Sequence, residues 1–367
     1  MITLIIFVAI LSLLVFVHEL GHFLLAKWHG VQVDEFGFGF PPRAWGWKKG
    51  DTTYSIDWIP LGGFVKIKGE DGEHSGDKDS FGHKPFWQRL SILVAGVVMN
   101  LALAWLLLTV GFMVGLPQLI ENFPSSARVS QPVIHIASVL TGSPADRAGL
   151  RPGDTIVSVD GQSVSDVEAF RARVDTPQGV NTVVVMRGKS TLPFTVTAEL
   201  LKETGRLGLG VALVKTGFVS YPWYLAPYEG LRAVIDVVRG IFSTLGGFVV
   251  GLFSSQRSAV EFSGPVGIAI LTSEVVKMGF RYLLQFTALL SVNLAVINIL
   301  PIPALDGGRV LFLLIEAGRG KRAGRTVEAL THNIGFMALM LLVLVVTYFD
   351  VLKYGDRLWR AVIGLFS

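Results

Sequence analysis

Two histidines and a glutamate in the first apolar stretch of the chain are the residues best suited to chemistry. They lie in the segment HELGH, residues 18–22, inside an apolar run over residues 2–25. Side chains four residues apart project from one face of a helix, so His18 and His22 can share a metal ion while Glu19 acts as a general base on water. Ionisable residues inside a membrane segment cost several kcal/mol, which favours a functional role over a chance pattern.

The composition places the chain among membrane proteins. Of its 367 residues, 51% are hydrophobic and 16% are charged, and the mean hydropathy is +0.55. The chain has no cysteine, so disulfides and thiolate zinc sites are excluded and a metal must be held by His, Asp or Glu. The mild net charge of +4 comes largely from residues beside apolar segments, which indicates contact with membrane surfaces and not with nucleic acid.

Four segments are predicted to cross the membrane. We assign the spans to residues 1–28, 90–116, 281–316 (broken near its end) and 333–350, with a tail over 351–367. The first segment lacks the basic residues and cleavage site of a signal peptide, so we expect it to be retained. Basic loops after the first and third spans place those loops in the cytoplasm. His18 then lies about 25 Å along a hydrocarbon core of about 30 Å, toward the cytoplasmic side.

Residues 29–89 form the first loop, with predicted strands over 31–42 and 53–68 that are interrupted by glycine and proline. Its many aromatic side chains suit a β-hairpin that dips into the membrane beside the metal. Such a position is tolerated only where protein or a cavity satisfies the backbone. A hairpin on the protein surface is the alternative.

Residues 223–280 hold an apolar helix of ambiguous placement and the segment SGPVGIA. Arg232, Asp236 and Arg239 recur along one side of the helix, which favours a position in the membrane interface over a crossing. In the second span, Asn100 is predicted to form an interhelical hydrogen bond.

A small α/β domain outside the membrane is predicted over residues 117–222, where apolar runs shorten to strand length. The predicted elements are strands at 133–140, 155–161, 182–186 and 194–198 and a helix at 167–174. The string S-P-A-x-x-A-G-L-x-P-G-D-x-I-x-x-V-D-G, residues 143–161, resembles the PDZ domains of bacterial envelope proteases. PDZ domains bind extended peptides by adding them to a sheet edge; a rigid spacer without a ligand is the alternative.

Asp306 is the candidate for a third metal ligand, since a catalytic zinc needs three protein ligands and one open position. It is the carboxylate that lies both in an apolar segment and in a helix break, PIPALDGG over residues 301–308. Spans entering from the same face would bring His18 and Asp306 to similar depth. The alternative role for Asp306 is to cap the helix that follows it.

These motifs together resemble a site-2 protease of the bacterial anti-sigma-factor-cleaving, regulator-of-sigma-E branch. The motifs are HELGH, GFGFPP (37–42), PLGGFVKI (60–67), the PDZ string, SGPVGIA (263–269) and NILPIPALDGG (298–308). The resemblance implies Zn²⁺ on His18, His22 and Asp306 with Glu19 as general base. It also implies that Asn298 contacts substrate, although an interhelical hydrogen bond is the alternative. Some members of this branch have two PDZ modules, whereas this chain has one.

We therefore expect a polytopic α-helical membrane protein with about four spans, a membrane-associated β-hairpin region and an inserted α/β PDZ domain. The expected function is an intramembrane zinc metalloendopeptidase that cleaves transmembrane segments of single-pass proteins, such as anti-sigma factors or remnant signal peptides. We expect it in the bacterial inner membrane, with the PDZ domain outside and the active site toward the cytoplasm.

The alternatives are a non-catalytic PDZ scaffold and a metal-ion transporter. A scaffold should lack a ligand or the base, and neither is missing. A transporter should carry ionisable residues along several spans, whereas the second span and residues 334–349 of the fourth have none.

Overall fold

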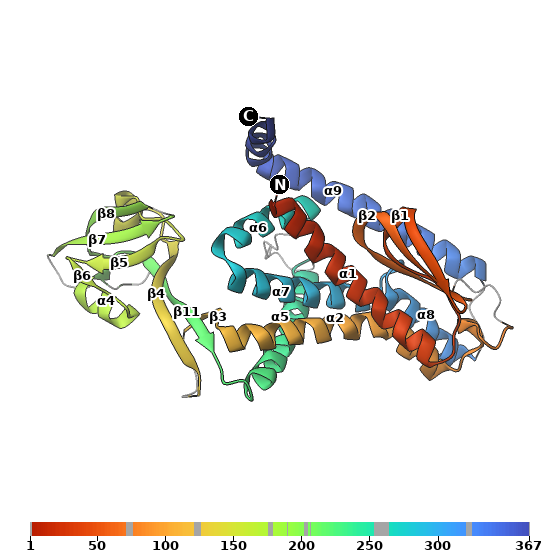
Figure 1. The fold of residues 1–367 in the computed structure, drawn as a ribbon. Helices are drawn as coiled ribbons and strands as arrows, with labels where there is room; N and C mark the ends of the chain where they lie inside the picture. Colours follow the sequence, from red (N-terminus) through yellow and green to blue (C-terminus); the bar gives the residue numbers. More distant parts are fainter. Residues whose placement is uncertain are drawn as a thin grey trace. The chain divides into compact units, whose positions relative to one another are not determined.

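The computed structural model describes residues 2–70, 76–120, 126–174, 179–188, 190–201, 205, 207–252, 264–320 and 325–366. The chain forms two compact units (Figure 1). The helix-rich unit comprises Met1–Thr109 and Pro227–Ser367, and the β-rich unit comprises Val110–Ala226. Ser263 of the SGPVGIA segment and two basic residues of the loop after the third span, Lys321 and Arg322, lie outside the described residues.

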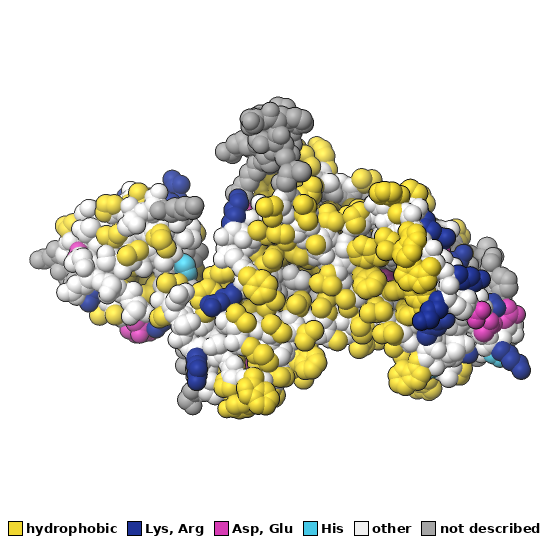
Figure 2. Space-filling view, in the orientation of Figure 1, with side chains coloured by type: hydrophobic (Ala, Val, Ile, Leu, Met, Phe, Trp, Pro, Cys, Tyr) yellow, Lys and Arg dark blue, Asp and Glu magenta, His cyan; other side chains and the backbone are white. Residues whose placement is uncertain are grey.

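Long apolar helices dominate the helix-rich unit. The helices are α1 (Ile2–Trp28), α2 (Phe86–Val114), α5 (Ala226–Leu252), α6 (Pro265–Met278), α7 (Phe280–Ile299), α8 (Asp306–Arg319) and α9 (Arg325–Phe366), with a 3-10 turn η1 at Phe81–His83. Among the described residues, α1, α2, α5, α7 and α9 are long and apolar enough to cross a membrane. Hydrophobic side chains cover much of the visible face of this unit (Figure 2). The predicted polytopic helical class is confirmed.

The broken third span and the last span differ in extent from the prediction. The range 281–316 becomes two helices, α7 and α8, because the prolines at 301 and 303 remove backbone donors and end α7. The last span belongs to a helix that starts before residue 333 and continues through the predicted tail.

The directions of α1 and α7 bear on the placement of α5. In Figure 1 both helices run toward α8, and Asn298 near the end of α7 lies beside His18 of α1. Since α1 and α7 cross the membrane in the same direction, an odd number of helices must cross between them in the chain. Helix α2 is one such crossing. Helix α6 has 14 residues and about 21 Å of length, too short to cross. The position in the membrane interface predicted for α5 agrees with these directions, although its length and composition alone would allow a crossing.

The first loop folds into a sheet of two long strands that each turn back on themselves. The strands are β1 (Val33–Lys49) and β2 (Thr52–Ile67). Residues 35–38 pair with 63–66 on one side and with 53–56 on the other, while 43–49 pair with 52–57. The predicted two-stranded hairpin is therefore a sheet of four segments, with residues 43–49 and 63–67 at its edges.

One edge of this sheet packs on α1 and the other is exposed. A Cβ at Gly63 would lie 3.5 Å from the Phe16 ring, and Phe36 packs on Phe16 with 5.4 Å between ring centroids. On the far edge, Trp45 and Trp47 are 61% and 44% exposed. The sheet thus lies beside the HExxH helix. Its insertion into the membrane stays a prediction.

The β-rich unit contains an antiparallel sheet with two short helices. Its elements are β3 (Leu116–Leu119), β4 (Arg128–Val139), α3 (Pro144–Ala148), β5 (Thr155–Val159), β6 (Gln162–Ser163), α4 (Val167–Val174), β7 (Val180–Arg187), β8 (Ser190–Thr197), β9 (Glu199–Leu200), β10 (Leu207–Gly208) and β11 (Val211–Ser220). The main sheet has the order β3-β11-β4-β5-β7-β8. The predicted helix is α4, and the predicted strands overlap β4, β5, β7 and β8. Strands β3 and β11 are not predicted from the sequence.

A buried ion pair holds the centre of this unit. Asp154 is 1% exposed and accepts hydrogen bonds from Nε and Nη2 of Arg187, both at 2.7 Å. It also accepts from the backbone N–H of Arg151 at 2.9 Å. The R-P-G-D turn, residues 151–154, is therefore held to the end of β7 by this ion pair. This explains why the PDZ-like string has an acidic residue at position 154.

Candidate metal centre

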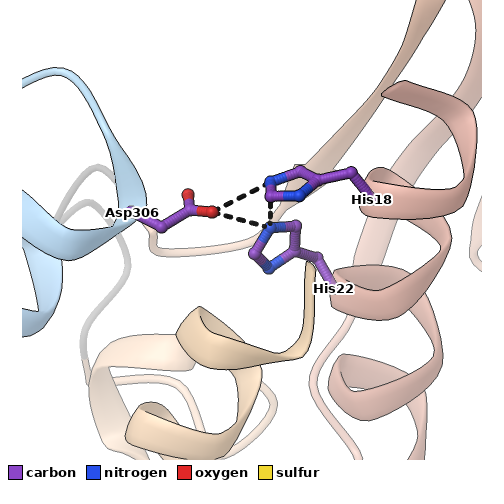
Figure 3. A group of neighbouring side chains, drawn as sticks. All are labelled: His18, His22 and Asp306. Atoms are coloured by element: carbon purple, nitrogen blue, oxygen red, sulfur yellow. Dashed lines mark hydrogen bonds and ion pairs between the residues drawn. The ribbon is translucent and has the colours of Figure 1, made fainter. Parts of the chain in front are cut away.

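His18, His22 and Asp306 meet at one point in the helix-rich unit (Figure 3). Oδ2 of Asp306 lies 2.9 Å from Nε2 of His18 and 3.3 Å from Nε2 of His22, and the two Nε2 atoms are 3.2 Å apart. Both histidines are buried, each 6% exposed. The structure therefore brings together the three side chains predicted as metal ligands.

The chemistry and spacing of these three atoms fit a zinc ion. Tetrahedral zinc with bonds of about 2.0–2.2 Å places neighbouring ligand atoms about 3.3 Å apart, close to the three separations above. Imidazole nitrogen and carboxylate oxygen are ordinary zinc ligands, and three of them leave one position for water or substrate. In the part of the chain that the structure describes, no other group of three His, Asp or Glu side chains converges in this way.

Two glycines allow the helix that carries the histidines to approach α2 closely. A Cβ at Gly21 would lie 2.4 Å from the carbonyl oxygen of Ala95. A Cβ at Gly96 would lie 2.4 Å from Nε2 of His22 and 2.6 Å from Cε1 of His18. Both distances are shorter than any relaxed contact, so larger side chains at these positions would force α1 and α2 apart.

Asp306 is aimed by the helix break that precedes it. Cβ atoms at Gly307 and Gly308 would lie 2.2 Å from the oxygen of Leu300 and 2.4 Å from that of Ile302, so α8 starts directly against the break. The capping alternative is not observed, because Leu305 occupies the N-cap and makes no side-chain cap bond.

Helix α9 supports the same break from another side. Ala304 has a positive φ of 76°, and its N–H donates to Nδ1 of His332 at 3.0 Å. A Cβ at Gly335, one turn further along α9, would lie 2.3 Å from Cβ of Pro303. Sequence reasoning did not single out His332. Its signal was an ionisable side chain at the start of an apolar span, where such residues often have a role.

The remaining predicted residues lie around the same centre. Glu19 is half-buried on the same helix turn, close enough to His18, His22 and Asp306 for electrostatic interaction. Asn298 on α7 places Nδ2 3.4 Å from Nε2 of His18. A carboxylate beside the ligand atoms is the arrangement that a general base requires.

Asn100 makes contacts to two other helices. Its side chain faces His18 on α1, with Nδ2 3.3 Å from Nδ1 of that ring, so the predicted interhelical hydrogen bond is present and sequence reasoning missed only its partner. Its backbone oxygen also accepts a bond from Oγ of Ser291 on α7 at 2.7 Å. The signal in the sequence was the four-residue spacing of Gly96 and Asn100. This spacing puts a residue without a side chain and an amide side chain one turn apart on one face of α2.

Comparison with known proteins gives one family across the chain. The model of Peptidase family M50 matches residues 6–342. The regulator of sigma-W protease RasP of Bacillus subtilis is 33% identical over 95% of this chain and 98% of its own length. A putative zinc metalloprotease of Clostridium acetobutylicum is 34% identical over 94% of this chain and 96% of its own length. The PDZ domain of an SdrC-like protein of Listeria monocytogenes aligns with 23% of this chain and 92% of its own at 19% identity, with a TM-score of 0.22.

Proposed function

This chain belongs to peptidase family M50 and is a zinc metalloprotease, and we propose that His18, His22 and Asp306 are the side chains that bind its zinc. We assign Glu19 as the general base. The convergence of three ligand atoms from α1 and α8 within 3.3 Å of one another is the observation that carries this proposal.

The chemistry that a bound zinc supplies is polarisation of a carbonyl group and a lowered pKa of water. Glu19 then removes a proton from the water that attacks the scissile carbonyl and delivers it to the leaving amine nitrogen. Its place beside the ligands suits both transfers. Asn298, at the rim of the same centre, donates from its amide to a carbonyl of the substrate backbone.

The substrate is a transmembrane segment of a single-pass protein. The relatives and the apolar helices establish an inner-membrane zinc protease of regulated proteolysis, and the burial of the histidines supports cleavage at membrane depth. A helical segment hides each peptide carbonyl in a hydrogen bond, so cleavage requires local unwinding. Since the B. subtilis relative is named a regulator of sigma-W protease, anti-sigma factors and remnant signal peptides are the classes to test first.

The unwound strand is held by the sheet edge at residues 63–67, which lies beside α1 but pairs only with residues 33–38 among the described strands. This edge passes α1 at Gly63, which lies against Phe16, two residues before His18. An extended substrate added here by backbone hydrogen bonds would run past the metal centre. The loop that carries the sheet faces the cytoplasm, so cleavage occurs toward that side.

A second recognition site lies in the β-rich unit, which we place outside the membrane as a PDZ domain. A cavity of about 830 Å³ separates β11 from α4 and is lined by residues that include Leu140, Phe170 and Val211. Residues 216–219 of β11 pair with β3, whereas 211–214 pair with β4 alone among the described strands. An extended peptide can therefore add along a short stretch of β11 before it meets β3.

The test of the catalytic assignment separates metal binding from chemistry. In proteoliposomes with a model transmembrane peptide, Glu19→Gln is expected to keep stoichiometric zinc by elemental analysis and to lose cleavage, because only the proton acceptor is removed. Glu229→Gln on α5 is the matched control and should cleave normally. Full activity of Glu19→Gln would remove Glu19 from the mechanism.

The same inactive variant identifies substrates. Single-span fragments are expected to accumulate in membranes of cells that carry Glu19→Gln in place of the wild-type protein, and mass spectrometry of membrane fractions would detect them. An unchanged membrane proteome would contradict the proposed substrate class.

A further inference from the structure

One face of α2 provides the surroundings of both candidate zinc ligands. Ile92, Gly96 and Asn100 follow each other at steps of four residues and so share a side of the helix. The carbonyl oxygen of Ile92 accepts a bond from Nδ1 of His22 at 2.8 Å. This bond places the ring proton on Nδ1 and leaves Nε2 free for a metal, which is how ligand histidines are oriented in zinc proteins.

His18 meets a different partner on the same face of α2. The side chain of Asn100 is fully buried. Its amide atom assigned as Nδ2 lies 3.3 Å from Nδ1 of His18. Its other terminal atom, assigned as Oδ1, has no hydrogen-bond partner among the described residues. A buried acceptor without a donor is unfavourable, so this arrangement calls for an explanation.

Zinc bound at Nε2 of His18 would give this acceptor a donor. A neutral imidazole that gives the Nε2 lone pair to a metal carries its proton on Nδ1, which then needs an acceptor. The two ends of an amide have nearly the same shape, and rotation by half a turn presents Oδ1 to that proton. We infer that Asn100 is a positioning residue whose Oδ1 accepts the Nδ1 proton of His18 and thereby orients Nε2 toward the zinc.

An amide is the side chain that can serve both states of this ring. With the ring proton on Nε2, where it faces Asp306 at 2.9 Å, the Nδ2 group donates to Nδ1. With the proton on Nδ1, the Oδ1 atom accepts it. Leucine has a similar shape and can do neither, and aspartate accepts only. Leucine and aspartate at position 100 therefore distinguish a hydrogen-bonding role of Asn100 from a packing role.

The test is zinc affinity, measured by competition with a chelating indicator on purified protein in detergent. The inference rests on the proposed assignment of His18 as a ligand, so His18→Ala is included and should lose zinc. Asn100→Leu is expected to bind zinc roughly 10- to 100-fold more weakly. Asn100→Asp should match or exceed the wild-type affinity, since it keeps the acceptor. The absorption spectrum of the Co²⁺-loaded protein should shift in Asn100→Leu and not in Asn100→Asp.

Ser291→Ala is the matched control, because it removes the hydrogen bond to the backbone of Asn100 and leaves its side chain in place. This variant should bind zinc normally. Equal affinities of Asn100→Leu and Ser291→Ala would overturn the inference, and zinc binding by His18→Ala would instead overturn the proposed ligand set. Should Asn100→Leu fail to fold, Asn100→Ala is expected to show the same loss, and normal affinity there would also overturn it.

Discussion

Gly96→Ala adds one methyl group at the point where α2 touches both histidines of the proposed zinc site. The new Cβ would lie 2.4 Å from Nε2 of His22 and 2.7 Å from Nε2 of His18. A relaxed contact needs about 3.5 Å, so the rings or the helices must move by about 1 Å. Zinc–ligand distances tolerate only about 0.2 Å. The substitution therefore displaces the Nε2 atoms of both histidine ligands.

The expected size of the effect follows from packing. Overpacking of a buried site costs about 1–3 kcal/mol. If this cost falls on the metal-bound state, zinc affinity drops roughly five- to 150-fold. Intrinsic helix propensity acts in the opposite direction, because alanine stabilises a helix by about 1 kcal/mol relative to glycine. A loss of zinc affinity in Gly96→Ala would therefore come from the clash and not from a weaker helix.

The assay compares Gly96→Ala with Gly240→Ala. A Cβ at Gly240 on α5 meets nothing within 4 Å, so this control adds the same group to a helix without a clash. Zinc content after dialysis against a chelator and cleavage of a model transmembrane peptide are measured for both variants. We expect loss of both in Gly96→Ala and neither in Gly240→Ala. Wild-type zinc affinity in Gly96→Ala would refute the packing described for α1 and α2.

Two further predictions concern the β-rich unit. A labelled extended peptide with a free carboxyl end should bind the full-length protein, and Arg171→Glu should weaken that binding several-fold, because this exposed cation lines the cavity beside β11. Fluorescence anisotropy measures this, Arg128→Glu is the control, and equal affinities would exclude the cavity as the site. Acid should destabilise this unit below about pH 4, the usual pKa range of an aspartate. Burial alone would raise the pKa of Asp154, but the hydrogen bonds from Arg187 and the Arg151 amide hold it below its usual value. The stability from this ion pair is therefore complete above the unfolded pKa and is lost as the pH falls through the folded one. Thermal melts between roughly pH 3 and 7 extend to both sides of the usual aspartate pKa of about 4. The melting temperature should depend less on acid in Asp154→Asn than in the wild type. An unchanged dependence would contradict the role given to the Asp154–Arg187 ion pair.

Local chemistry explains which parts of the protein were predictable. The spacing of His18 and His22 depends only on the helical repeat, and the apolar runs are long enough to identify the spans from composition. Asp306 could be selected because carboxylates are rare in apolar segments, and its break is visible in the prolines and glycines around it. The alternation of apolar and polar residues over 155–161 predicted the strand β5.

The four-segment sheet of the first loop and the pairing of β3 with β11 depend on partners that are distant in the chain. Leu116 pairs with Val219, and residues 35–38 pair on both sides, neither of which leaves a periodic signal. Asn100 is a similar case, because the sequence shows an amide in an apolar helix but not which side chain it faces. That depends on how closely α1 and α2 approach, which Gly21 and Gly96 set through contacts between the two helices. Residue type and period are therefore properties of the sequence, whereas the surroundings of each ligand arise only from packing.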